Sequence, residues 1–103
     1  MLSLLEALVL DLLSIHSPTY GLDLVHRSGG RLKRGSVYVT LGRMEQKGLV
    51  TSELEERLGD GPPRRLYVPT ALGLKALLAS RLLEGDLPLG RLRKPVAARS
   101  SER

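Results

Sequence analysis

The stretch from Ser36 to Val50, SVYVTLGRMEQKGLV, decides how the rest of the chain is interpreted. Three apolar residues recur at helical spacing and would form the buried face of one helix over residues 36–47: Val37, Leu41 and Met44. Ser36 is the expected N-cap, and Gly48 is a typical helix stop. The opposite side of this helix is small, hydrogen-bonding and positively charged, and it carries no acidic residue.

That outward side has the chemistry of a DNA-reading helix. Arg43 can donate two hydrogen bonds to guanine, Gln46 can pair with adenine, and Val39 can pack on a thymine methyl group. Other residues on the same side would contact phosphates, which position a helix without specifying sequence: Ser36, Thr40 and Lys47. Two plainer interpretations stay open, because Arg43 could be a solvated surface residue and Ser36 only a helix cap.

The flanking elements predict a mainly α fold with one small β-hairpin. Helices are expected at about 2–15 and 20–28 before the central helix; strands at 49–57 and 65–69 follow it, and Thr70 caps a helix at 71–84. This order, helix-helix-helix-strand-strand-helix, is that of a winged helix-turn-helix, in which the third helix enters the major groove. We expect one domain over residues 1–84 and a basic tail over 85–103.

Two further surfaces follow from this layout. The loop of the hairpin would bring three arginines near its tip, where they could bind phosphates or remain solvated: Arg57, Arg64 and Arg65. The first helix is apolar on most sides apart from a narrow stripe that includes Glu6, so a second copy of the chain is expected to cover it. The expected dimer interface combines leucines of the first and last helices: Leu4, Leu5, Leu8, Leu12, Leu74, Leu78 and Leu82.

Composition narrows the class of function. The 103 residues carry 16 Lys and Arg against 11 Asp and Glu, which gives a net charge of +5 and suggests a polyanionic partner.

Cysteine is absent, and the histidines His16 and His26 are too far apart for a metal pair on one helix, so neither a metal nor a cofactor is expected. The acidic residues Glu53, Glu55 and Glu56 are poorly spaced for an acid–base pair on one strand face, and no nucleophile is expected near them, so the chain is not expected to be an enzyme. The apolar segment 2–15 is too short and too charged to span a membrane, and a cytoplasmic location is expected.

Four segments together resemble PadR-type transcriptional regulators. They are YGLDL at 20–24, GSVYVTL at 35–41, RMEQKGLV at 43–50 and RLYVPTALG at 65–73, in the family's order and spacing. The resemblance implies a homodimeric winged-helix repressor of a pseudo-palindromic operator, in which the Tyr38 hydroxyl reaches a phosphate while its ring packs on the second helix. Some members also release DNA when a small molecule binds.

The sequence departs from the family pattern in three ways. Members usually carry proline where this chain has Val39, and they usually have a longer C-terminal helix than one that ends near Glu84. Phe and Trp are absent, so a small-molecule effector lacks the usual aromatic pocket between protomers. Two alternatives stay open: a winged-helix module that binds a protein partner without DNA, and a repressor that responds to a ligand. The basic outward surface favours DNA over a protein partner.

Overall fold

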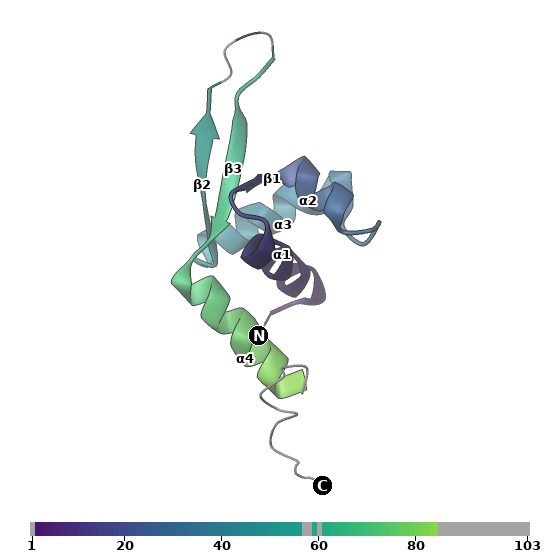
Figure 1. Cartoon of the computed structure of the whole chain (residues 1–103), viewed down its shortest axis with the longest axis vertical. Helices are drawn as coiled ribbons and strands as arrows, with labels where there is room; N and C mark the ends of the chain where they lie inside the picture. The colour runs from purple at the N-terminus through teal and green to yellow at the C-terminus, as the bar shows by residue number, and fades with distance from the viewer. Residues whose placement is uncertain (1, 57–58, 60, 85–103) are drawn as a thin grey trace, which may run out of the picture.

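The structure is a computed structural model that describes residues 2–56, 59 and 61–84 (Figure 1). Its elements are α1 (Leu4–Ile15), β1 (Thr19–Tyr20), α2 (Gly21–Arg27), α3 (Arg34–Gln46), β2 (Val50–Glu55), β3 (Arg64–Pro69) and α4 (Ala71–Glu84). The predicted order of helices and hairpin strands is confirmed. The expected tail at 85–103 lies outside the described residues.

An aliphatic core joins the three N-terminal helices to the base of the hairpin. Its fully buried side chains are Val9, Leu10, Leu13, Leu24, Val37, Leu41 and Met44, and Leu32, Leu49, Val50, Tyr67 and Leu77 complete it. The inner face of α3 is therefore the one that the sequence predicted. Ser3 caps α1: its hydroxyl accepts from the backbone N–H of Glu6, whose carboxylate accepts in return from the N–H of Ser3.

The start of α3 differs from the prediction. The helix begins at Arg34, its N-cap is Lys33, and Ser36 lies inside the first turn rather than at the cap. The reason lies in the connector before it. Leu32 is buried, and its backbone N–H donates to the Ser28 hydroxyl at 2.9 Å, which fixes the chain early enough for the helix to start two residues before Ser36.

The sheet has one more strand than the sequence predicted. Thr19 and Tyr20 pair with Tyr67 and Leu66 of β3, so the order is β1-β3-β2 and both pairings are antiparallel. Tyr20 was expected in the second helix, which instead begins at Gly21. A two-residue strand carries no alternation of its own, so only its partner strand reveals it. The hairpin extends from the helices, and β1 ties its base to them (Figure 1).

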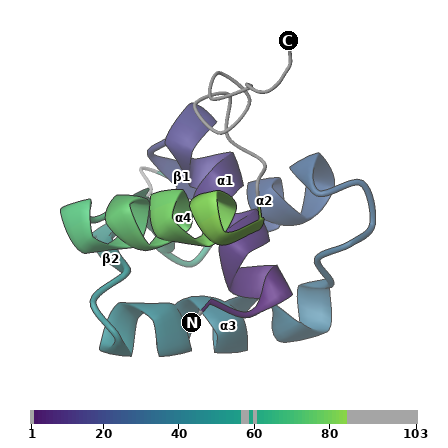
Figure 2. The ribbon, with the colours of Figure 1, turned by 90° about the horizontal axis from the view of Figure 1, so that it is seen from below.

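A close backbone contact docks α4 on the start of β2. The Thr70 side chain accepts from the N–H of Gly73 at 2.9 Å, which confirms Thr70 as the helix cap, and it donates to the Gly48 carbonyl at 2.6 Å. Gly73 then lies directly on the Leu49 carbonyl, where an added Cβ would be 2.1 Å from that oxygen. Seen from below, the first turns of α1 lie between α4 and α3 (Figure 2).

Candidate nucleic-acid interface

The outer side of α3 is open to solvent. Val39 is 56% exposed, and the side chains of Arg43 and Gln46 are exposed beside it, whereas Ser36 and Thr40 are half-buried at the margins of this surface. The structure therefore brings the predicted base-reading residues together on one accessible face. Because these three can read guanine, adenine and a thymine methyl group, the face can present a base-reading pattern to a major groove.

Tyr38 connects α3 to α2. Its ring lies on Gly21, where an added Cβ would be 2.7 Å from Tyr38 Cε1, so only glycine allows this approach. The predicted packing of this ring on the second helix is confirmed, and the side chain still keeps 50% of its surface exposed. All three tyrosines of the chain line one groove between these helices and the hairpin, with a volume of about 590 Å³: Tyr20, Tyr38 and Tyr67.

Both described arginines of the hairpin are exposed, and both are held by side-chain contacts near the loop end of its strands. The Arg64 guanidinium stacks over the Tyr20 ring, 3.9 Å from its centroid. The Tyr20 hydroxyl donates to Glu55, and this hydrogen bond, together with burial and the charge of Glu55, raises the tyrosine's pKa. The third predicted arginine, Arg57, lies outside the described residues.

The second hairpin arginine reaches α3 through a serine. Arg65 Nη1 donates to the Ser52 hydroxyl at 3.1 Å, and that hydroxyl donates to Glu45 Oε2 at 2.9 Å. Arg65 is thereby held on the side of the hairpin that faces α3. Sequence reasoning did not identify Ser52 and Glu45, since they act only through a contact between distant segments.

Lys47 occupies a different position from the other basic residues of α3. It is the C-cap of the helix, and its Nζ is 2.6 Å from Glu6 Oε2 on α1. Burial raises the pKa of Glu6, but hydrogen bonds from Lys47 and Ser3 and the charge of Lys47 outweigh it, so that the pKa is lowered overall. The carboxylate therefore stays ionised beside the lysine at neutral pH.

Apolar side chains remain exposed along α1 and α4. Leu4 is 86% exposed, and three leucines one turn apart on α4 keep about half of their surface: Leu74, Leu78 and Leu82. Leu5, Leu8 and Leu12 are half-buried against the core. Ile15, Leu72 and Leu83 are also exposed, and they were not among the predicted interface residues. Apolar helix faces of this extent suit burial against another molecule.

Among the residues that the structure describes, no cluster of three or more His, Cys, Asp or Glu side chains could hold a metal ion. None of the helices that the structure describes combines the length and apolar character needed to cross a bilayer.

Three helices, a three-stranded antiparallel sheet and a following helix, with an exposed third helix beside a hairpin, define a winged-helix protein. The PadR-like family of transcriptional regulators matches residues 9–79, and the chain belongs to this family. It is a family of regulators rather than enzymes, in agreement with the sequence analysis.

Individual relatives agree with this assignment. The chain is 44% identical to the transcriptional regulator Rv3488 of Mycobacterium tuberculosis over 55 residues, which are 53% of this chain and 50% of that protein, so the match spans half of the relative's length. A PadR family regulator from Clostridium difficile superimposes with a TM-score of 0.68 at 26% identity, over 79% of this chain and 86% of that one.

A second solved structure shares the fold. Bacillus subtilis PadR, solved in complex with operator DNA, has a TM-score of 0.68 at 20% identity, over 76% of this chain and 47% of that one.

Proposed function

We propose that this protein is a homodimeric repressor that binds a pseudo-palindromic DNA operator, with α3 in the major groove and the hairpin as the wing on the adjacent backbone. The observation that carries the proposal is the exposed face of α3, where Val39, Arg43 and Gln46 stand clear of the core. Family membership supports it, and so does the fold shared with a relative solved on its operator.

In this arrangement phosphate contacts surround the base-reading face. Ser36, Tyr38 and Thr40 lie along α3, and Arg64 and Arg65 lie on the wing, with Arg57 proposed for the wing tip. Arg31 and Lys33 of the connector before α3, and Arg34 at the first position of the helix, are exposed and add to the same positive field. Positive charge on this scale attracts the DNA backbone before any base is read. Lys47 differs from this set because its ammonium group already holds Glu6.

The proposed dimer buries the exposed leucines of α1 and α4 against a second copy. The stripes supply apolar surface on both helices, and a two-fold interface uses the same patch of each protomer. Such symmetry places the two α3 helices about one turn of DNA apart, which matches a pseudo-palindromic site. We assign residues 1–84 to the DNA-binding and dimerisation domain and treat 85–103 as an appended basic tail.

Fluorescence anisotropy tests the proposal. The full chain is titrated against a duplex from the region upstream of its own gene and against a scrambled duplex of equal length and composition, both at about 50 mM salt. We expect preference for the upstream region by about a thousandfold. Equal binding to both duplexes would contradict autoregulation through a specific site, and no binding would favour the protein-binding module instead.

Replacing Arg43 with Ala should weaken operator binding by about 1–3 kcal/mol, because a bidentate contact to guanine is lost. Discrimination should relax at one base pair in each half-site, and a panel of operators with single substitutions measures this. Arg64→Ala is the matched control: loss of a phosphate contact should weaken all sequences alike. An Arg43 variant that keeps the parent's sequence preference would contradict the assignment of α3 as the reading helix.

Replacing Leu78 with Glu should break the dimer. Leu78 is 50% exposed at the middle of the row of exposed α4 leucines. Burying the exposed half of this side chain contributes about 0.8–1.5 kcal/mol in each protomer, since complete burial of a leucine contributes about 1.5–3 kcal/mol. Sedimentation should therefore show a monomer at concentrations where the parent is a dimer. Leu54→Glu is the control, since Leu54 is equally exposed but lies on β2. If Leu78→Glu left the dimer intact, the interface would lie elsewhere.

A further inference from the structure

Glu6 is a buried carboxylate that takes no part in the proposed base reading or in the apolar surface proposed for the dimer. Only 5% of the residue is exposed, and both of its oxygens are engaged. Oε1 accepts the backbone N–H of Ser3 at 2.9 Å and so caps α1, while Oε2 accepts from Lys47 Nζ at 2.6 Å. One side chain thus joins the first turn of α1 to the C-cap of α3.

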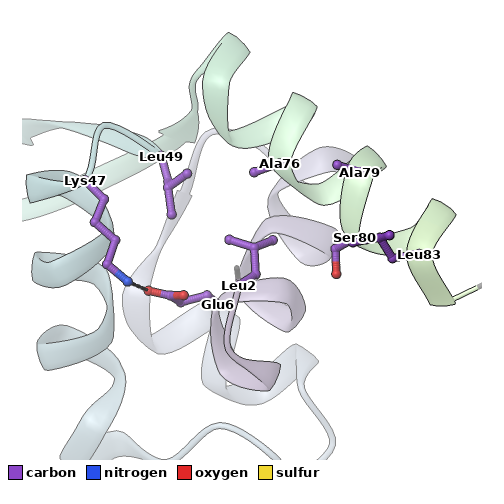
Figure 3. A pocket seen from close by; sticks show the side chains of 8 residues that line it. All are labelled: Leu2, Glu6, Lys47, Leu49, Ala76, Ala79, Ser80 and Leu83. Atoms are coloured by element: carbon purple, nitrogen blue, oxygen red, sulfur yellow. Dashed lines mark hydrogen bonds and ion pairs between the residues drawn. The ribbon is translucent and has the colours of Figure 1, made fainter.

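Lys47 approaches from the end of α3. Its backbone N–H still closes the helix by donating to the Arg43 carbonyl at 3.0 Å, and Gly48 follows with a φ of 78° that turns the chain away. The side chain runs from this helix end to α1 (Figure 3). Its ammonium group is therefore held at a defined point relative to Arg43, one helical turn earlier.

The ion pair spans a junction that is otherwise loosely filled. A cavity of about 550 Å³ lies beside the pair, between α1, α4 and the start of β2 (Figure 3). Its apolar lining comprises Leu2, Leu49, Ala76, Ala79 and Leu83. Apolar packing on this side therefore does not by itself fix the position of α3 relative to α1. The charge-assisted hydrogen bond between Lys47 and Glu6 has a defined geometry and removes this freedom.

Glu6 lies on the side of α1 opposite Leu4 and Leu8, two of the leucines proposed for the dimer interface. Leu4 and Leu8 are one helical turn apart and share a side of the helix, whereas Glu6, two residues from each, points the other way. The residue that contacts α3 and the residues proposed to contact the partner thus share one short helix. Any rotation of α3 relative to α1 would change the angle between the two recognition helices of a dimer.

We propose that Glu6 is a positioning residue: through Lys47 it fixes α3 against the dimerisation helix α1 and thereby sets the half-site spacing that the dimer accepts. This inference rests on the proposed function, since spacing has meaning only for a dimer on DNA. In this proposal Lys47 holds α3 in place within the protein and does not contact a DNA phosphate.

Two variants break the pair from opposite ends. Glu6→Gln keeps the capping interaction with Ser3, because Gln serves in a capping box as Glu does, but it removes the charge. Lys47→Gln removes the ammonium group from a side chain that is itself 55% exposed. Lys47→Arg restores a cation and should restore the parent's behaviour. Glu53→Gln is the matched control, the same chemical change at an exposed carboxylate on β2.

The direct test is the distance between the two recognition helices in the dimer. The chain has no cysteine, so Gly42→Cys places one spin label on each α3, at an exposed position where an added Cβ meets nothing within 4 Å. Pulsed electron paramagnetic resonance without DNA should give one narrow distribution near about 34 Å for the parent and for Glu53→Gln. Glu6→Gln and Lys47→Gln should broaden or shift it.

The same variants are then compared on operators with altered spacing. Insertion of one base pair rotates one half-site by about 35° relative to the other. The parent's preference for the correct spacing should fall by about tenfold in Glu6→Gln and in Lys47→Gln, the factor produced by losing one charge-assisted hydrogen bond. Lys47→Arg, which keeps a cation at this position, should retain the parent's preference.

The outcomes separate the two proposals. A narrow inter-label distance that neither variant changes, with spacing preference retained, would overturn the role of Glu6 and leave the repressor intact. The complete absence of an inter-label distance in the parent would overturn the dimer and, with it, this inference.

Discussion

Replacing Gly73 with Ala is expected to lower the free energy of unfolding by about 3 kcal/mol, at the upper end of the usual cost of overpacking. The new methyl carbon would lie 2.1 Å from the Leu49 carbonyl oxygen and 3.0 Å from a Leu10 methyl group, so α4 must move away from β2. Thermal unfolding should show a midpoint lower by about 12–24 °C, because 1 kcal/mol corresponds to about 4–8 °C in a domain of this size.

Gly42→Ala is the control for this measurement, and its effect should have the opposite sign. Gly42 lies within α3, and an added Cβ there meets nothing within 4 Å. Alanine should stabilise such a helical position by about 0.5–1 kcal/mol. If Gly73→Ala proved as stable as Gly42→Ala, the close docking of α4 on the Leu49 carbonyl would be wrong.

Raising the salt concentration from about 50 to 200 mM is expected to weaken operator binding by about 10³–10⁵-fold, which corresponds to about 6–10 phosphates neutralised by a dimer. Within the described part of each copy, six basic residues besides Lys47 are exposed on α3, the connector before it and the wing: Arg31, Lys33, Arg34, Arg43, Arg64 and Arg65. Anisotropy titrations at several salt concentrations give the slope of log affinity against log salt.

Variants sharpen the salt measurement. Removing one phosphate contact should reduce the slope by about one, so Arg64→Ala should be shallower than the parent, whereas Lys47→Gln should keep the parent's slope because that lysine holds Glu6. A parent slope close to zero would rule out backbone neutralisation as the main source of affinity.

Much of the fold could be predicted because its signals are local. The periodicity of Val37, Leu41 and Met44 gave the inner face of α3, and the glycine at 48 gave its end. Thr70 marked the start of α4 correctly. The errors have two sources. β1 exists only because the distant strand β3 pairs with it, and the start of α3 follows a local turn, held by the bond between Ser28 and Leu32, that the helical periodicity does not reveal.

The candidate site was predictable to the same extent. The outward residues of α3 follow from helical geometry alone, so their exposure could be foreseen. The capping-box spacing of Ser3 and Glu6 was visible in the sequence, but nothing local pairs Glu6 with a lysine 41 residues away. The contact from Arg65 through Ser52 to Glu45 likewise depends on how the hairpin lies on α3.

The pairing of β1 with β3 bears on how the chain folds. Thr19 and Tyr67 are neighbours in the sheet although 48 positions separate them, so this pairing closes a loop that contains α2, α3 and β2. Closing a loop of that length costs about 3 kcal/mol of chain entropy, which the local contacts of the helices do not incur. The hairpin alone, as a two-stranded element, would be marginally stable in water. The wing is therefore not a portable module: grafted onto another scaffold without Thr19 and Tyr20, it would lose the strand that anchors it.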